Sequence, residues 1–220
     1  MSGPRPPQAL FFDFDGLICD TESAAHRSWQ ELYAEHGLSF PDTLWSAMVG
    51  RADGEALAAN RLAQLLDGAD TTALVARRRR RKRELCDAEP LRPGVRALLE
   101  SARADGVPAA VVSSSPYAWV APHLDRLEVR HLFAFLVTGD LTERHKPHPD
   151  LYESALRGLE GPPSGAVVAF EDSATGVRAA RAAGVYCVAV PNGVGSAADL
   201  AHADAVLPSL THYELGTRAA

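Results

Sequence analysis

Two aspartates lie two positions apart at the end of a short apolar run near the start of the chain. The run is Ala-Leu-Phe-Phe over residues 9–12, and Asp13 and Asp15 follow it. One such carboxylate can attack an electrophile or bind a metal, while the other exchanges a proton with a leaving group. The alternative is a polar turn after a strand, helped by Gly16. Calcium loops also contain Asp-x-Asp-Gly, but the next residues here, Leu-Ile-Cys, offer no further oxygen ligands.

A second acidic pair, Glu171 and Asp172, follows the apolar run 166–170. Two adjacent acids after an apolar strand are costly to bury unless a cation neutralises them. We therefore predict that Asp172 joins Asp13 around Mg²⁺, which prefers hard oxygen ligands and usually retains waters. Asp172 or Ser173 could instead cap the helix expected next, and the two roles are compatible.

A serine and a lysine supply groups suited to a phosphate. Ser113 follows two valines, and a hydroxyl with adjoining backbone N–H groups at a strand–helix junction can hold a phosphate oxygen. A simple cap is the alternative for a lone serine. Lys146 lies in the loop sequence His-Lys-Pro-His-Pro-Asp. It could be a surface residue, but beside several carboxylates and a phosphate it would balance charge.

These residues follow apolar runs that are typical of buried strands. Five such runs end in polar residues: 9–12, 107–112, 133–137, 166–170 and 185–190. Helical patterns lie at residues 93–99, 150–159 and 175–183. Apolar strands alternating with helices predict an α/β fold, a Rossmann-like parallel sheet covered on both faces. Ligands of such sheets bind beyond the carboxyl ends of the strands, where the reactive residues fall.

Residues 20–89 differ from the rest of the chain. They contain several helical patterns and no convincing strand. We predict that they form an α-helical cap, inserted into a catalytic core made of residues 1–19 and 90–220. The segment Pro-Leu-Arg-Pro-Gly at 90–94 is the expected return hinge.

Composition and charge argue against several classes of function. The net charge is −6, so a global nucleic-acid or membrane role has no electrostatic support. No apolar run approaches the roughly 18 residues that a membrane helix needs, and residues 1–8 do not resemble a signal peptide. We expect a cytoplasmic protein. Its three cysteines are odd in number and widely spaced, and we expect them to be buried structural residues: Cys19, Cys86 and Cys187.

Residues 77–83 are all basic. Such a run can indicate nucleic-acid binding. It also continues a helical pattern, and over two helical turns its charges would be spread around the helix. We expect most of these side chains to be solvated and no nucleic-acid partner.

Four segments of the chain together resemble the haloacid dehalogenase superfamily. They are Phe-Asp-Phe-Asp-Gly, Val-Val-Ser-Ser-Ser, Lys-Pro-x-Pro-Asp and Phe-Glu-Asp-Ser-x-x-Gly, in the order that the family shows. The match spans nearly the whole chain. The most similar branch is the sugar-phosphate phosphatase and β-phosphoglucomutase group, which carries a helical cap where residues 20–89 lie.

The resemblance implies roles for the acids. Asp13 would attack phosphorus and become a transient aspartyl phosphate. Asp15 would protonate the leaving alcohol and then activate the water that hydrolyses the intermediate. Mg²⁺ would be held by the Asp13 carboxylate, the Asp15 backbone carbonyl and Asp172, with Glu171 nearby. Branches that cleave carbon–halogen or phosphonate bonds lack an acid at the position of Asp15, so its presence favours an oxygen leaving group.

The resemblance also implies which residues contact the substrate. Ser113 and the Ser114 backbone would bind phosphate oxygens, and Lys146 would stabilise the charge on the transferring group. In the cap, Arg51 could bind a second phosphate or sugar hydroxyls, with an exposed surface arginine as the alternative. Lys82 falls near the place of a cap lysine that reaches the active site in mutase-like members.

The expected function is that of a Mg²⁺-dependent phosphatase acting on a small phosphorylated metabolite, with a phosphosugar mutase as the alternative. The chain departs from the family pattern at two positions. His145 replaces a common glycine, which changes the loop. The first cap helix carries His26 one position later than expected, with Ala25 in its place, and this displacement favours the phosphatase. A binding protein on a retained fold is a further alternative, but it would have no need for Asp15. The oligomeric state is left open, and a monomer is compatible with the sequence.

Overall fold

The computed structural model describes residues 6–48, 53–159, 161–194 and 200–216. The chain divides into two compact units, Met1–Asp20 with Pro90–Ala220, and Thr21–Glu89. Among the described residues, no helix combines the length and the hydropathy needed to cross a bilayer.

The first unit is built on a six-stranded sheet in the order β3-β2-β1-β4-β5-β6. The strands are β1 (Ala9–Phe12), β2 (Ala109–Val112), β3 (Phe135–Val137), β4 (Val167–Glu171), β5 (Tyr186–Ala189) and β6 (Ala205–Val206). All neighbours pair in parallel. The chain steps from β1 outward to β2 and β3, then returns to the other side of β1 for β4. The carboxyl ends of β1 and β4 therefore flank the point where the strand order reverses, which is the usual binding crevice of such sheets.

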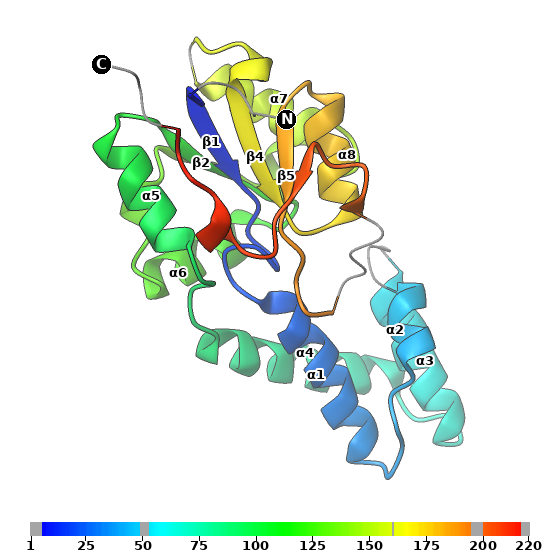
Figure 1. Cartoon of the computed structure of the whole chain (residues 1–220). Helices are drawn as coiled ribbons and strands as arrows, with labels where there is room; N and C mark the ends of the chain where they lie inside the picture. The colour runs from blue at the N-terminus through cyan, green and yellow to red at the C-terminus, as the bar shows by residue number, and fades with distance from the viewer. Residues whose placement is uncertain (1–5, 49–52, 160, 195–199, 217–220) are drawn as a thin grey trace. The chain divides into compact units, whose positions relative to one another are not determined.

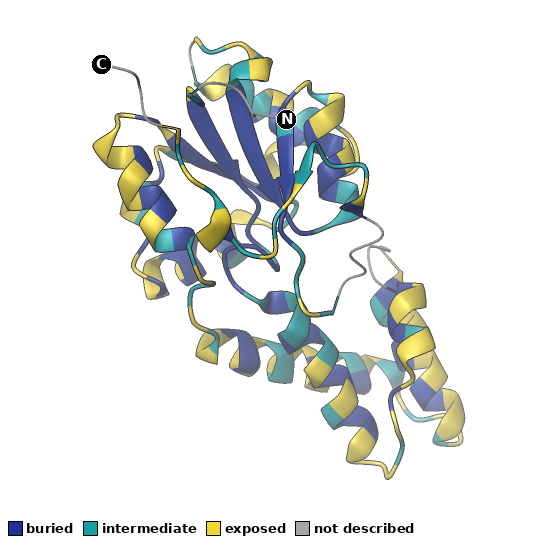
Figure 2. Cartoon of the chain, in the orientation of Figure 1, coloured by how far each residue is buried: buried dark blue, intermediate teal, exposed yellow. Residues whose placement is uncertain are grey.

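Helices cover both faces of this sheet, which confirms the predicted α/β class (Figure 1). Alternate residues of β1 point to opposite faces. Leu10 and Phe12 lie in a core cluster with α5 (Val95–Ala104) and α6 (Tyr117–Arg126). Phe11 lies in a second cluster with α7 (Asp150–Gly158) and α8 (Ala174–Ala182). The central strands β1, β2 and β4 are buried along their whole length, while the helices that cover the sheet are buried only toward it (Figure 2).

The five predicted strands are present, with bounds that differ from the predicted ones by at most two residues, but α6 and the two-residue β6 were not predicted. Pro122 lies inside α6 and costs it a backbone hydrogen bond. Burial of Val120, Ala121 and Leu124 outweighs that loss.

In the second unit, residues 21–48 and 53–89 are described and form four helices, α1 (Thr21–Ala34), α2 (Asp42–Met48), α3 (Gly54–Leu65) and α4 (Thr71–Ala88). An aromatic group fills its interior. Trp29 stacks on Phe40 at 6.1 Å between ring centroids, and the Tyr33 hydroxyl donates to the Ala58 carbonyl at 3.0 Å. The region is therefore a helical insertion between β1 and β2.

The basic run of residues 77–83 lies on α4, and most of its side chains are exposed or partly exposed, as expected; Arg78 is the exception. That side chain is buried: its guanidinium pairs with Glu55 at 3.2 Å and lies over the Trp29 ring at 5.2 Å. Arg81 pairs with Glu31 of α1 at 2.5 Å, and Arg77 pairs with Glu35, directly after α1, at 2.8 Å. Much of the run thus holds the helical insertion together.

The three cysteines are buried, as expected. Burial raises the pKa of the Cys187 thiol well above its usual range. This is the behaviour of a structural residue rather than a nucleophile.

Candidate active site

Three acids meet at the carboxyl ends of the adjacent strands β1 and β4. Asp13 follows β1, Glu171 is the last residue of β4, and Asp172 comes next. One carboxylate oxygen from each lies within 4.8 Å of the others. Asp13 and Asp172 are each 6% exposed and Glu171 is fully buried. We call Asp13, Glu171 and Asp172 the acidic cluster.

A single ammonium group is buried against this cluster. Lys146 Nζ lies 2.5 Å from Asp13 Oδ1 and 2.6 Å from Glu171 Oε1, and it donates to the Val112 carbonyl at 2.7 Å. The Lys146 side chain is only 5% exposed. Residues from the exits of β1, β2 and β4 therefore converge on one lysine, although Lys146 is 133 positions from Asp13 in the chain.

The electrostatics of the cluster make Asp13 reluctant to ionise. The pKa of Asp13 is raised to about 8. Burial is the largest cause, the Lys146 ammonium lowers the pKa, and the nearby Glu171 and Asp15 carboxylates raise it. One lysine is thus too little positive charge for this group of acids. A further cation would complete the neutralisation.

The acidic cluster fits a divalent cation. Its members offer hard carboxylate oxygens, and Glu171 Oε2 is buried with no hydrogen-bond partner in the described part of the chain. Asp13, Asp172 and Glu171 would hold the ion, which, when bound, would neutralise charge on the nucleophile and on a phosphate.

We expect Mg²⁺ binding to release a proton and to strengthen as the pH rises toward 8. Asp13 holds a proton below its pKa of about 8, and the cation needs the carboxylate. The apparent affinity should fall roughly tenfold per pH unit below that pKa and level off above it. Titration calorimetry across this range, in two buffers of different ionisation enthalpy, measures both effects. An affinity that does not change with pH would contradict this electrostatic account.

Two polar side chains that hold the acids were not predicted. The Tyr152 hydroxyl, on α7, donates to Glu171 Oε1 at 2.5 Å. The Asn192 amide, beyond β5, donates to Asp172 Oδ2 at 2.6 Å. Tyr152 lies in a predicted helix, and Asn192 follows a predicted strand. Their contacts depend on side-chain directions that no spacing reveals.

Two glycines leave room for the same carboxylates. A Cβ at Gly16, where φ is +78°, would overlap the Asp172 carboxylate. A Cβ at Gly176 would overlap the Glu171 carboxylate. Ser173 caps α8 by accepting from the Gly176 backbone N–H at 3.1 Å. Ser173, and not Asp172, is therefore the helix cap, and the Asp172 carboxylate lies beside those of Asp13 and Glu171.

Asp15 lies beside the cluster and is held by two donors. The Ser115 hydroxyl contacts Asp15 Oδ2 at 2.5 Å, and the indole Nε1 of Trp119 donates to Oδ1 at 3.0 Å. Neither donor was predicted, because Trp119 lies on the helix that the sequence did not reveal. The carboxylate of Asp15 is thus oriented through both of its oxygens.

The serine segment after β2 lies next to these groups. Ser113 is 1% exposed, and its hydroxyl oxygen accepts from the Ser115 backbone N–H at 3.0 Å. The residue before α6 is Pro116, so Ser113 does not cap that helix. The Lys146 backbone N–H approaches the Ser114 hydroxyl at 3.4 Å. The role of Ser113 and Ser114 in phosphate binding stays a prediction.

Two residues of the insertion were predicted to contact the substrate. Arg51 falls outside the described residues. Lys82 lies on α4, in the other unit. Their contact with a substrate stays a prediction.

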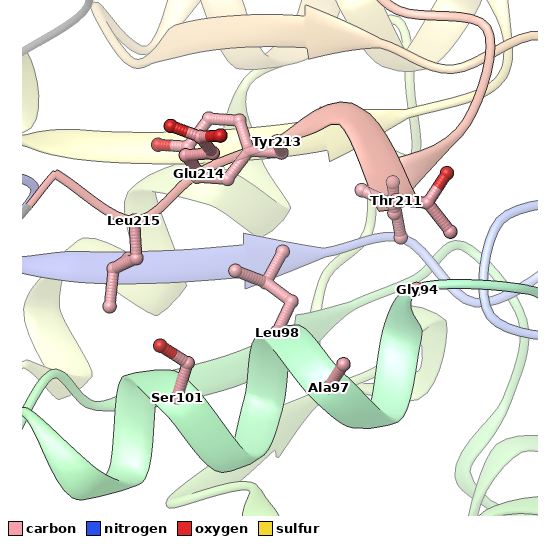
Figure 3. A pocket seen from close by; sticks show the side chains of 9 residues that line it. Gly94, Ala97, Leu98, Ser101, Thr211, Tyr213, Glu214 and Leu215 are labelled. Carbon is pink, nitrogen blue, oxygen red and sulfur yellow. The ribbon is translucent and has the colours of Figure 1, made fainter.

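The unit that contains the sheet also carries a pocket of about 560 Å³, between α5 and the segment 210–215 (Figure 3). Leu98 and Ala97 face it from the helix, and Tyr213 and Leu215 face it from the segment. None of the predicted site residues is among those that line it. The acidic cluster, with its buried carboxylates and the Lys146 ammonium, is the better candidate for chemistry.

Comparisons with known proteins point to one family. The chain matches the family model described as haloacid dehalogenase-like hydrolase over residues 7–184. The protein YhcW of Bacillus subtilis is 38% identical over 212 residues, which cover 94% of each chain. A Thermotoga maritima protein named phosphorylated carbohydrates phosphatase is 30% identical over 180 residues, covering 81% of this chain and 82% of that protein.

The solved structures agree. A HAD family hydrolase from Deinococcus radiodurans, crystallised with bound phosphate and sodium, superposes with a TM-score of 0.78 at 29% identity. The match covers 94% of this chain and 93% of that chain. The likeness therefore includes the insertion as well as the sheet.

Proposed function

The chain belongs to the haloacid dehalogenase-like hydrolases, and from this premise we propose that it is a Mg²⁺-dependent phosphatase of small phosphomonoesters. The substrate class that we propose is a sugar phosphate. The observation that carries the proposal is the placement of Lys146 between Asp13 and Glu171. Phosphoryl transfer needs positioned groups and charge neutralisation more than it needs elaborate covalent chemistry.

In the proposed reaction Asp13 is the nucleophile. Its carboxylate attacks phosphorus, the bond to the leaving alcohol breaks, and an aspartyl phosphate forms. Lys146 stabilises the negative charge that gathers on the carboxylate and the phosphoryl oxygens. Water then attacks the phosphorus of this intermediate and restores Asp13.

Asp15 is the proposed acid and base. It gives a proton to the leaving alcohol in the first step and takes one from water in the second. An indole N–H can only donate, whereas a hydroxyl can donate or accept. Since Trp119 donates to Oδ1 and Ser115 contacts Oδ2, we place the transferable proton on Oδ2.

The relatives support the substrate class. One is named for phosphorylated carbohydrates, and another is named validoxylamine A 7'-phosphate phosphatase. Both names describe phosphatases of phosphorylated compounds, and the first names carbohydrates as the class. A phosphatase for such esters needs the oxygen leaving group that Asp15 favours.

A panel of sugar phosphates tests the proposal. Release of inorganic phosphate that depends on Mg²⁺ is the expected result. Interconversion of phosphate isomers that depends on a bisphosphate primer would instead favour the mutase. No turnover of any panel member in the presence of Mg²⁺ would contradict both and favour a binding protein.

Replacing Trp119 with phenylalanine is expected to lower kcat about tenfold, since a hydrogen bond to a charged group contributes on the order of 1.5 kcal/mol or more. An aromatic side chain is retained, but the donor to Asp15 Oδ1 is lost together with the five-membered ring that carries it. Steady-state kinetics on the best panel substrate gives the measurement, with KM expected to change less than kcat.

The matched control is Tyr117→Phe on the same helix. It also removes a polar group from an aromatic ring, but the Tyr117 hydroxyl contacts Arg130 rather than Asp15. Equal losses in the two variants would mean that the effect of Trp119 comes from the helix and not from Asp15.

A further inference from the structure

An arginine in the segment that returns from the insertion binds two backbone carbonyls near the acidic cluster. The guanidinium of Arg92 donates through Nη1 to the Gly16 carbonyl and through Nη2 to the Pro191 carbonyl, the latter at 3.0 Å. Gly16 follows β1 and Pro191 follows β5. One side chain therefore joins the loops that leave two strands of the sheet.

The backbone around Arg92 is itself fixed within this unit. The Arg92 N–H donates to the Ile18 carbonyl at 2.9 Å, and Leu91 forms an antiparallel bridge with Cys19. The segments that lead out to the insertion and back from it are thus paired with each other. Arg92 is anchored to this pair at its backbone and to the two loops at its side chain.

Both loops that Arg92 joins touch Asp172. Gly16 packs so closely against the Asp172 carboxylate that a Cβ there would overlap it. Asn192, directly after Pro191, donates to Asp172 Oδ2 at 2.6 Å, and its own Oδ1 accepts from the Val194 N–H at 3.1 Å. Asp172 is therefore held between two loop segments whose carbonyls share one guanidinium.

We propose that Arg92 is a positioning residue for the metal site: by joining the Gly16 and Asn192 loops it holds Asp172 in place and so sets the affinity for Mg²⁺. The inference rests on the proposed function for the identity of the cation. Groups that orient a metal ligand typically change metal affinity ten- to a hundredfold when they are removed. Nothing in the catalytic steps uses Arg92 directly.

Charge alone predicts the opposite effect. A guanidinium near a divalent cation repels it, so removing that charge should strengthen Mg²⁺ binding. Loss of positioning should weaken it. The sign of the change in affinity thus separates the two accounts.

The experiment compares Arg92→Gln and Arg92→Lys with the unaltered protein. Lysine keeps the charge but, as a single ammonium on a flexible stem, it does not reproduce the planar fork that spans two carbonyls. We expect the Kd for Mg²⁺, measured by titration calorimetry, to rise roughly ten- to a hundredfold in both variants. An unchanged or lower Kd in Arg92→Gln would overturn the proposal.

Arg96 supplies the matched control. It lies on α5 and also bridges two backbone carbonyls, those of Leu127 at 2.9 Å and Glu128 at 3.3 Å. Arg96→Gln is expected to leave the Kd for Mg²⁺ unchanged. If its Kd rises as much as that of Arg92→Gln, the effect reflects general loosening of the unit and the proposal fails.

A second variant keeps the proposal testable if Arg92→Gln unfolds. Asn192→Ala removes the contact with Asp172 at the other end of the same loop. Since Arg92 is proposed to act partly through that loop, Asn192→Ala and Arg92→Lys together should raise the Kd by less than the product of their separate factors. A Kd in the double variant that rises by the full product of the two factors would contradict a common action of Arg92 and Asn192 through this loop. Because binding is read without turnover, these results are independent of whether the protein hydrolyses sugar phosphates.

Discussion

The Asp13→Asn protein is expected to release phosphate at least about a thousandfold more slowly than the unaltered protein, as is usual when a covalent nucleophile is removed. The amide has nearly the same shape as the carboxylate but cannot form the acyl phosphate. Because Asp13 is buried among acids, losing its charge is not expected to destabilise the fold. Phosphate release from the best panel substrate, with Mg²⁺ present, gives the measurement.

The control for this variant is Asp105→Asn. Asp105 is exposed at the end of α5 and takes no part in the site. Acid quenching during turnover, followed by intact mass spectrometry, should reveal a phosphorylated species in the Asp105→Asn protein and none in the Asp13→Asn protein. Full Mg²⁺-dependent phosphate release by Asp13→Asn would show that the nucleophile has been misassigned.

Replacing Lys146 with methionine is expected to lower kcat about a hundred- to a thousandfold, the usual effect of removing one group that stabilises charge in the transition state. The reason is the loss of the only ammonium within contact of Asp13 and Glu171 among the described residues. The methionine stem keeps most of the buried volume, so packing contributes little to the change. Kinetics with saturating Mg²⁺ gives this part of the result.

The same variant is expected to lose stability in the absence of Mg²⁺, and increasingly so as the pH rises. With Lys146 present, the pKa of Asp13 is already about 8; without the ammonium it rises further. A carboxyl whose pKa is higher in the folded state than in the unfolded state loses stability as the pH rises toward its folded value. The unaltered protein shares this loss up to about pH 8, so urea unfolding of both proteins below and above pH 8 measures the extra loss in the variant.

Arg144→Met is the control for Lys146→Met. Arg144 lies in the same loop, pairs with Asp150 at 2.9 Å, and its side chain is 61% exposed. An exposed pair contributes at most about 1 kcal/mol, so this variant should behave nearly as the unaltered protein at every pH. A pH-independent loss in Lys146→Met, equal to that of Arg144→Met, would refute the electrostatic role.

Much of the site could be predicted because strand ends are visible in sequence. Asp13, Ser113 and Glu171 each end an apolar run, and a parallel sheet brings such ends to one edge. The position of Lys146 in the site was predicted from the family resemblance, because its loop has no periodicity that indicates where the side chain points. The partners Tyr152, Asn192 and Trp119 could not be predicted, because a contact across the sheet depends on rotamers and on the order of strands.

The insertion shows the same limit. Its helical character could be predicted from the apolar spacing, but the burial of Arg78 within the basic run could not. A stretch of like charges looks solvated until the acids that face it are known. Arg78 is buried because Glu55 and the Trp29 ring lie opposite it, and both are more than twenty positions away in the chain.

The two glycines beside the acidic cluster place a limit on how this chain can evolve. Positions 16 and 176 carry no reactive group, yet any side chain there would displace the carboxylate of Asp172 or Glu171. A lineage that changes its substrate must therefore keep both codons as glycine while other positions diverge. The helical insertion supplies none of the acidic cluster, so substitutions within it leave all three carboxylates of the cluster in the sequence.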